Sequence, residues 1–196
     1  MEEGKSISFR DLLRARVFDS EGRHIGHVQD MAMEMDTKAA SPIMGHLGVH
    51  LLWTDRVGPV ELVRRVEDIV ILLPWSKVAS IGEDEVRLSE AHPALTAESV
   101  EGKRLVRRDI LDKQMLDSKG NRIQRVDDVL MKFEEGALKV VGLEVSKSLL
   151  LTSSNLRSHI ARLRRRHGGG KDSDVIPWEA VVRIEEEAVV IEEAAE

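Results

Sequence analysis

An internal duplication constrains the fold of this chain more than any other feature. Residues 10–22 return as residues 108–120, with Arg-Asp at the start and Asp-Ser-x-Gly at the end of both stretches. A second segment, 73–78, returns as 176–181 with Pro-Trp in the same place. A repeat has to be recognised before any local prediction, because it determines how the whole fold is read. We therefore expect two copies of one small domain.

The size and composition set the class of protein. The chain has 196 residues, so each copy has about 100, which is enough to fold without a metal or a disulfide. Cysteine is absent, which excludes disulfides and thiolate metal sites and is typical of a reducing compartment. No run approaches the roughly 20 apolar residues of a membrane span, and the N-terminus lacks a secretory signal. We expect a cytoplasmic protein without a transmembrane segment, with membrane association through a partner.

Charge and aromatic content argue against two kinds of binding surface. The formal net charge of -6 is enough for solubility and does not mark the whole chain as a nucleic-acid binder. Aromatic residues make up 3% of the chain and tyrosine is absent. A platform that stacks bases or sugars needs exposed aromatic faces, so none is expected.

Turn signals separate short apolar runs along the whole chain, as in a small β-sandwich or barrel. Residues 19–22 are typical of a hairpin turn, in which Asp and Ser bond the local backbone and Gly22 takes a positive φ. The alternation slips within residues 25–35, which predicts a bulge near Gly26. Pro74 cannot donate to a ladder and therefore ends a strand. The predicted fold is all-β, with two tandem small antiparallel β-barrels, each around an apolar core of its own.

The domain boundaries follow from the repeat. We place the first barrel at residues 7–90, a linker at 91–104 and the second barrel at 105–193. The second copy contains an insertion, residues 154–167, in which apolar residues recur at helical spacing and basic residues gather at the C-terminal end. Glycines at 168–170 end this pattern. We expect one inserted amphipathic helix that the first copy lacks.

The repeated pattern resembles the PRC-barrel superfamily. In the first copy the resemblance is carried by Val17, Asp19, Ser20, Gly22, Ile25, Gly26, Val28 and Asp30. In the second copy it is carried by Asp117, Ser118, Gly120, Ile123, Val126, Asp128, Gly142, Leu143 and Val145, while Gln124 departs from the usual glycine. The resemblance implies small, mainly antiparallel barrels without enzymatic activity that serve as docking surfaces. The tandem arrangement resembles the PRC-barrel pair of magnesium-transporter-like proteins.

The histidines are weak candidates for a metal site. His24 and His27 are three residues apart, which in a regular strand puts their rings on opposite faces. His46 and His50 would share a face, but no Asp, Glu or Cys close in sequence completes a ligand set. We interpret these histidines as ordinary strand residues.

Asp30 and Asp128 stand at matched positions of the two copies, and we consider them as candidate magnesium ligands. Asp30 and Asp128 would sense magnesium if the resemblance to transporter-like proteins extends to function, although nothing in their spacing selects for this ion.

The chain contains no phosphate-binding loop pattern, and no His and Asp recur around Ser20 and Ser118 as a catalytic base and its orienting group would. No cofactor and no enzymatic activity are therefore expected.

The basic insertion allows three interpretations. Its arginines are Arg157, Arg162, Arg164, Arg165 and Arg166. In the first, these arginines are solvated and only complement the dipole at the end of the helix. In the second, they form a binding patch for anionic lipid, RNA or an acidic partner. In the third, the acidic C-terminal tail of this chain or of a second subunit covers them.

Together these features predict a non-catalytic adaptor or regulatory module that docks a protein partner. The sequence does not identify this partner. The resemblance to magnesium-transporter-like proteins suggests that the module belongs to a magnesium-transport system. A homodimer is compatible with the sequence. The alternative is RNA or ribosome-assembly binding through residues 157–166. Binding to RNA that weakens steeply with salt would favour the alternative.

Overall fold

The computed structural model describes most of the chain. All structural statements below concern residues 4–34, 41–52, 63–65, 68–92, 98, 100–146 and 173–192. Strands dominate this part of the chain and its helices are short, so the predicted all-β class is confirmed.

The first half contains eight strands and two single-turn helices among the described residues. They are β1 (Ser6–Ser8), α1 (Phe9–Leu12), β2 (Arg16–Phe18), β3 (His24–Glu34), β4 (Ile43–Leu51), β5 (Val63–Arg65), β6 (Asp68–Pro74), the 3-10 helix η1 (Trp75–Lys77), β7 (Val78–Ile81) and β8 (Glu85–Leu88).

The second half presents a closely similar order. Its elements are β9 (Arg104–Leu105), α2 (Val106–Asp109), β10 (Gln114–Leu116), β11 (Arg122–Arg125), β12 (Asp128–Glu134), β13 (Ala137–Ser146), β14 (Ser173–Pro177), the 3-10 helix η4 (Trp178–Ala180), β15 (Val181–Ile184) and β16 (Ala188–Ile191). Here β11 and β12 together stand where the first half has the single long strand β3.

The strand pairing of the two halves also agrees in register. β2 and β8 pair in parallel with Val17 opposite Val86, and β10 and β16 pair in parallel with Met115 opposite Val189. All four side chains are buried. In β2, β8 and β10 the buried residue stands between less buried neighbours, so a one-residue slip would expose it, whereas all four residues of β16 are buried.

The predicted hairpin turn forms in both halves. Asp19 accepts hydrogen bonds from the backbone N–H groups two and four residues ahead, at 3.0 and 2.9 Å. Asp117 does the same at 2.9 and 2.8 Å. Gly22 and Gly120 have φ values of +79° and +83°, which a residue with a side chain rarely adopts. The Asp-x-x-Gly chemistry therefore closes both turns as the sequence predicts.

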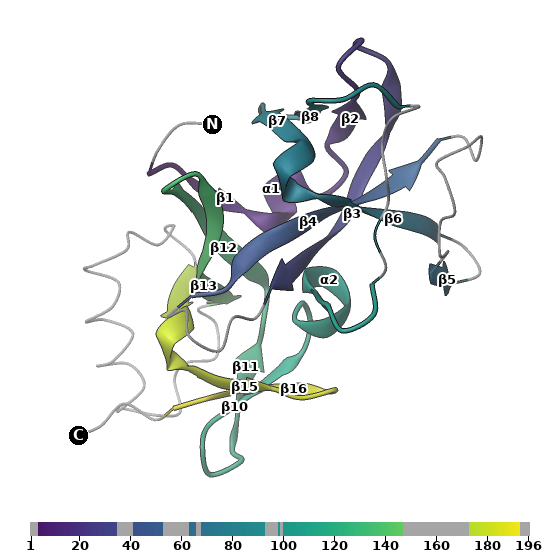
Figure 1. Cartoon of the computed structure of the whole chain (residues 1–196). Coiled ribbons are helices and arrows are strands. Elements are labelled where there is room, and N and C mark those ends of the chain that lie inside the picture. The colour runs from purple at the N-terminus through teal and green to yellow at the C-terminus, as the bar shows by residue number, and fades with distance from the viewer. Residues whose placement is uncertain are drawn as a thin grey trace.

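The main sheet runs through both halves in the order β1-β12-β13-β4-β3-β2-β8-β7 and curls into a half-barrel (Figure 1). A smaller sheet, β11-β10-β16-β15, forms the opposite end of the molecule from β2, β7 and β8 (Figure 1). A single continuous sheet thus joins the two copies, which the repeat by itself does not predict.

The leading segments of the two halves are exchanged. β1 pairs with β12 of the second half, with Ile7 opposite Met131. β9 pairs with β3 of the first half, with Leu105 opposite Ala32. Each half therefore receives its first strand from the other half.

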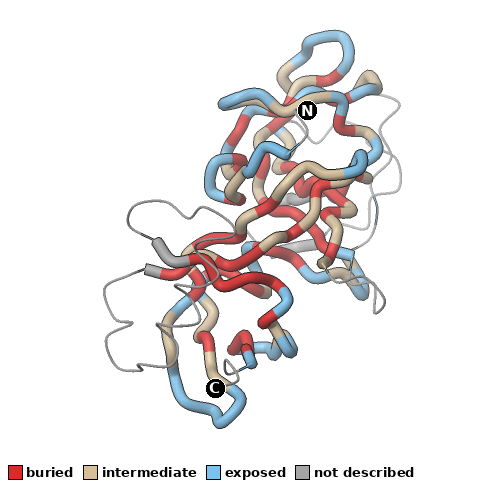
Figure 2. Tube along the Cα trace, turned by 90° about the vertical axis from the view of Figure 1, so that its left-hand side faces the viewer, coloured by how far each residue is buried: buried red, intermediate tan, exposed pale blue. Residues whose placement is uncertain are grey.

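The exchange merges the cores. One hydrophobic cluster contains residues of both halves, including Phe9, Val28, Met115 and Val129, all with no exposed surface. Figure 2 shows buried residues continuing through the middle of the molecule, where the halves meet. The expectation that each copy encloses an apolar core of its own is therefore wrong. The boundaries at 7–90, 91–104 and 105–193 stay a prediction.

Candidate functional site

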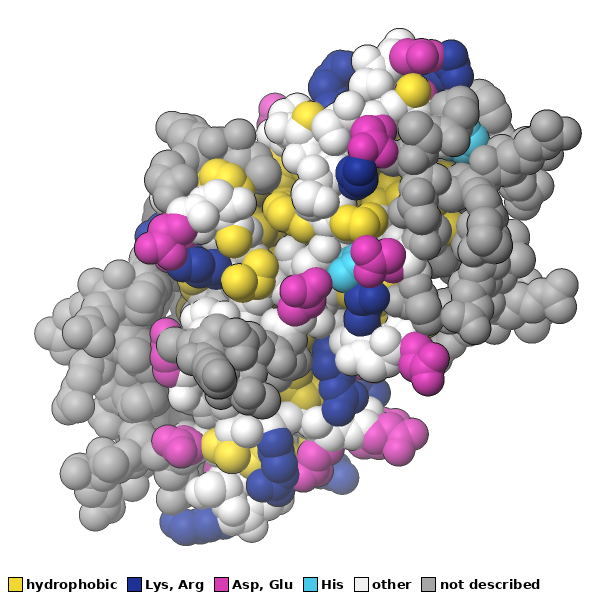
Figure 3. All heavy atoms as spheres, in the orientation of Figure 1, with side chains coloured by type: hydrophobic (Ala, Val, Ile, Leu, Met, Phe, Trp, Pro, Cys, Tyr) yellow, Lys and Arg dark blue, Asp and Glu magenta, His cyan; other side chains and the backbone are white. Residues whose placement is uncertain are grey.

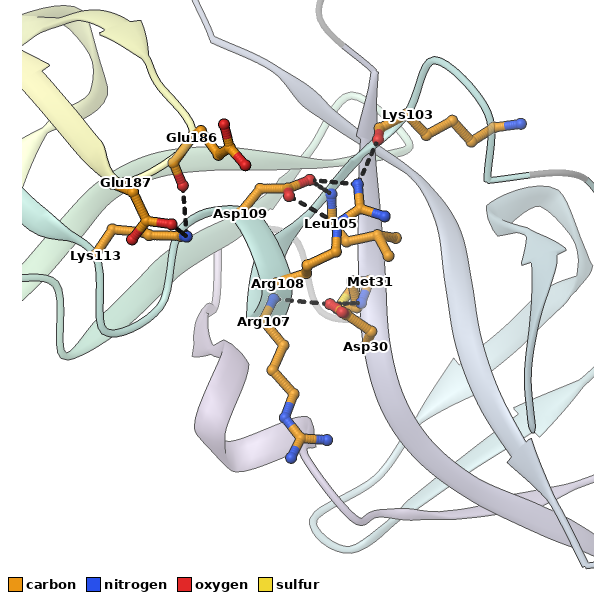
Figure 4. Close-up of polar contacts among 10 residues, drawn as sticks. All are labelled: Asp30, Met31, Lys103, Leu105, Arg107, Arg108, Asp109, Lys113, Glu186 and Glu187. Carbon is orange, nitrogen blue, oxygen red and sulfur yellow. Dashed lines mark hydrogen bonds and ion pairs between the residues drawn. The ribbon is translucent and has the colours of Figure 1, made fainter. Parts of the chain in front are cut away.

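The junction between the halves is built around a buried carboxylate, Asp30. Its Oδ1 accepts hydrogen bonds from the backbone N–H of Met31 at 2.7 Å and of Arg107 at 2.8 Å. Arg107 lies in the first turn of α2, whose backbone N–H groups have no partner within the helix. Figure 4 shows the Arg107 side chain pointing away from Asp30, so the contact is to the backbone. A residue of the first half thus caps a helix of the second.

Asp128 makes the same contact in the opposite direction. Its Oδ1 accepts from the backbone N–H of Val129 at 2.8 Å and of Arg10 at 3.1 Å. Arg10 lies in the first turn of α1, which also has a capping box between Ser8 and Asp11. The two exchanged segments are therefore held by equivalent aspartates.

Burial shifts the protonation of both aspartates. It raises the pKa of Asp30 to about 6, against the opposing effect of the hydrogen bonds from Arg107 and Met31. Burial also raises the pKa of Asp128. In both cases desolvation disfavours the charged form more than the amide donors favour it.

A second set of polar contacts ties α2 to the C-terminal end of the fold. Asp109 accepts from the backbone N–H of Leu105 at 2.8 Å and pairs with the guanidinium of Arg108 at 2.7 and 2.8 Å. Lys113 donates to the backbone carbonyl of Glu186 and lies 4.0 Å from a carboxylate oxygen of Glu187 (Figure 4). The aspartate of the repeated Arg-Asp pair plays the same part in both copies, since Asp109 accepts from the backbone N–H of Leu105 before α2 and Asp11 accepts from that of Ser8 before α1.

A pocket of about 670 Å³ lies where the two edges of the main sheet approach each other. One side is formed by Ser6 and Ile7 of β1, and the other by Ile81 and Gly82 at the end of β7. Among the described strands, β1 pairs only with β12 and β7 only with β8. Both strands that border the pocket therefore present an edge without a neighbouring strand.

The pocket combines an apolar floor with charges of both signs. Ile7, Leu12, Leu13, Ile81 and Phe133 contribute apolar surface. The cationic residues Lys5 and Arg10 and the acidic residues Asp11, Glu83 and Asp84 surround this floor. On the face of the molecule drawn in Figure 3, acidic and basic side chains are interleaved rather than gathered by sign.

His46 is a buried polar residue whose contacts the sequence does not predict. Its Nε2 lies 2.7 Å from Glu98 Oε2, and Lys103 Nζ lies 3.2 Å from the same oxygen. Its Nδ1 lies 3.8 Å from Glu34 Oε1. The sequence contains no local signal for this group, because Glu98 is 52 residues away from His46.

Three other histidines gather on the outer face of the sheet. The ring centroids of His24 and His27 are 4.9 Å apart, and His50 is the strand partner of His27. The expectation that His24 and His27 point to opposite faces is wrong. A register shift between Val17 and Phe18, where β2 pairs with β3, breaks the regular alternation. This bulge lies where the sequence predicts one.

The other predicted site residues have different outcomes. Arg157, Arg162, Arg164, Arg165 and Arg166 and the helix at 154–167 lie outside the described residues. Asp30 and Asp128 each accept a hydrogen bond from one backbone N–H of the opposite half. The hypothesis that either aspartate senses magnesium stays a prediction. Within the described ranges, no group of three or more His, Asp or Glu side chains could hold a metal ion, and no helix is long and apolar enough to cross a membrane.

No protein-family model matches this chain, and no characterised protein is significantly similar to it in sequence. Its function has to follow from the geometry of its own residues.

Proposed function

We propose that the chain is a non-catalytic adaptor that holds a protein partner in the pocket between β1 and β7. The observation that carries this proposal is that, within the described part of the chain, both bordering strands have an unpaired edge above an apolar floor. An unpaired strand edge is a template for another strand, and folded proteins usually cover it.

The partner would be an extended segment that adds a strand to this edge. In such complexes the backbone hydrogen bonds supply affinity, and alternate side chains supply specificity by entering pockets. Ile7, Ile81 and Phe133 favour an aliphatic side chain at the inward-facing position.

The charges around the pocket would set the direction of the bound segment. Lys5 and Arg10 attract an acidic group at the β1 side, whereas Glu83 and Asp84 attract a basic group at the β7 side. Charge complementarity of this kind favours one orientation over the reverse.

The architecture we propose is a pair of PRC-type barrels in tandem, with exchanged leading segments. The matched registers of β2–β8 and β10–β16 support this view, as do the paired turns at Asp19 and Asp117. The resemblance to tandem PRC-barrel proteins of the magnesium-transporter-like type extends the proposal to a partner that belongs to a membrane transport system.

The test is to select extended peptides on the full chain from a random library and to map the bound peptides by NMR. We expect shifts at the backbone amides of residues 6–8 and 78–84. Ile7→Glu and Ile81→Glu place a charge on the apolar floor and should weaken binding at least about tenfold, because a buried unpaired charge is costly.

Val182→Glu is the matched control, since Val182 is an exposed apolar residue outside the pocket. It should bind as the unmodified chain does. Peptides that map elsewhere, or that bind the Ile7→Glu and Ile81→Glu variants unchanged, would contradict the proposal. Binding to RNA alone, with steep salt dependence, would favour the alternative function.

A further inference from the structure

The imidazole of His46 is held in one orientation by Glu98. Glu98 Oε2 lies 2.7 Å from His46 Nε2 and 3.2 Å from Lys103 Nζ, and a carboxylate oxygen accepts hydrogen bonds from both nitrogens. The proton between Nε2 and Oε2 therefore belongs to His46 Nε2, a tautomer assigned from the hydrogen-bond network. In the neutral ring the other nitrogen, Nδ1, then carries a lone pair.

Nδ1 of His46 is buried and has no hydrogen-bond partner among the described residues. The His46 side chain is 4% exposed, whereas that of Glu34, whose Oε1 lies 3.8 Å from Nδ1, is 60% exposed. A buried polar atom without a partner is uncommon in folded proteins and calls for an explanation.

Gly45 creates the space in which Glu34 approaches His46. A Cβ at residue 45 would lie 2.3 Å from Glu34 Oε1 and 2.5 Å from its Cδ. The carboxylate therefore occupies the place of the missing side chain, next to the unpartnered nitrogen. Glu34 ends β3 and faces Ile43 at the start of β4, so the sheet itself positions this group.

We propose that His46 Nδ1 and the Glu34 carboxylate bind a divalent transition-metal ion of the zinc type. Imidazole and carboxylate are ligands that such ions accept, and a ligating histidine usually donates its other N–H to a carboxylate, as His46 does to Glu98. Glu98 acts as the positioning residue and Lys103 in turn orients Glu98.

The separation of His46 Nδ1 and Glu34 Oε1 is close to that of two ligand atoms on one metal ion. Zinc binds nitrogen and oxygen at about 2.0–2.1 Å in a tetrahedral arrangement, which holds two ligand atoms roughly 3.3 Å apart. The observed separation is 3.8 Å, so a shift of roughly half an ångström in the exposed Glu34 side chain is sufficient for that arrangement. With two protein ligands instead of the three or four of a structural site, water fills the other positions and the affinity is modest.

The site belongs to the first half alone. At the matching register the second half has Lys132 in place of Glu34 and Gly142 in place of His46. Because Glu98 lies between the two halves in the sequence and bridges to Leu72 of β6, a bound ion would strengthen the attachment of this connection to the first half. The inference does not depend on the proposed docking pocket.

The test is titration of the full chain with zinc chloride by calorimetry, and with cobalt chloride by visible absorption. We expect one ion per chain, and a change in the ¹⁵N shift of His46 Nδ1 by NMR. His46→Gln and Glu34→Gln should each weaken binding at least about tenfold, and Glu98→Gln should weaken it by about 10–100-fold.

His50→Gln is the matched control and should bind as the unmodified chain does. Glu34 is exposed, so the Glu34→Gln variant is expected to fold, which its amide NMR spectrum checks. Absence of binding at millimolar zinc would overturn the proposal. Binding that survives in Glu34→Gln and His46→Gln, or that is lost in His50→Gln, would overturn it as well, because the ion would then belong to the histidines on the outer face.

Discussion

Asp30 accepts a hydrogen bond from the backbone N–H of Arg107 at 2.8 Å, although 77 residues separate them in the sequence. The same contact joins Asp128 to Arg10 across 118 residues. These two bonds mark the places where each half holds the leading segment of the other. They make the junction a part of the fold rather than a surface between two finished domains.

The stability of the junction should depend on pH through Asp30. Its pKa is about 6 in the folded chain against an ordinary value of 3.8. Between these values the folded state holds a proton that the unfolded state has lost, so the free energy of unfolding falls as pH rises, by up to about 3 kcal/mol. Asp30→Asn keeps the accepting oxygen and removes the charge, so this loss should disappear.

Urea unfolding of both chains from pH ~4 to ~7 measures the difference. Asp128→Asn should change the slope in the same direction, because the pKa of Asp128 is also raised. Asp117 provides the contrast. Hydrogen bonds, first from the Asn121 side chain, lower its pKa below the ordinary value of 3.8, so its stabilisation is complete above that value and is lost only at lower pH. Asp117→Asn should therefore leave the slope between pH ~4 and ~7 unchanged. Equal slopes for Asp30→Asn and the unmodified chain would refute the prediction.

Removing the accepting oxygen should loosen one exchanged segment at a time. Asp30→Ala leaves the amides of Met31 and Arg107 without their acceptor and should lower the free energy of unfolding by about 1–3 kcal/mol. Amide hydrogen exchange should become faster at Arg107 but not at Arg10. Asp128→Ala should give the reverse pattern. Faster exchange at both positions in either variant would show that the two segments open together.

Two residues with side chains adopt a left-handed conformation at matched positions. Arg14 has φ +72° and Asp112 has φ +60°. Glycine adopts this conformation without steric cost, so Arg14→Gly should raise the free energy of unfolding by about 0.5–1 kcal/mol. Asp112→Gly should raise it less, because aspartate tolerates the conformation better than arginine. Thermal unfolding measures both, and Arg16→Gly in β2 is the control, which should destabilise. A loss of stability in Arg14→Gly would contradict this account.

Gly26 allows β3 and β4 to approach closely. A Cβ there would lie 2.2 Å from the carbonyl oxygen of His50, so Gly26→Ala requires the backbone to move and should destabilise by about 1–3 kcal/mol. Gly45→Ala is the matched comparison. Its Cβ meets only the end of the exposed Glu34 side chain, which can rotate away. Urea unfolding should therefore show a larger loss for Gly26→Ala, and equal losses would be inconsistent with the geometry.

The pocket and the polar groups could be predicted from the sequence only in part. Gly26 and the slipped alternation predicted a bulge, and the pairing of β2 with β3 contains one next to this glycine. The consequence for His24 and His27 was not predicted, because the side to which a bulge turns a ring depends on the partner strand. His46 was considered with His50, its neighbour in the same strand. Its contacts are instead Glu34 and Glu98, which the pairing of β3 with β4 and the course of the chain after β8 bring to it.

The sequence by itself determined the two hairpin turns. Asp19 and Asp117 bond amides within four residues, and Gly22 and Gly120 meet a local conformational demand, so these features need no distant partner. Only the tertiary structure decided which half each leading segment joins. β1 and β9 have the same local preference for an extended strand followed by one helical turn, whichever sheet they meet. The choice depends on buried contacts, such as Ile7 with Met131 and Arg107 with Asp30, between residues too far apart in the chain for local pattern to specify.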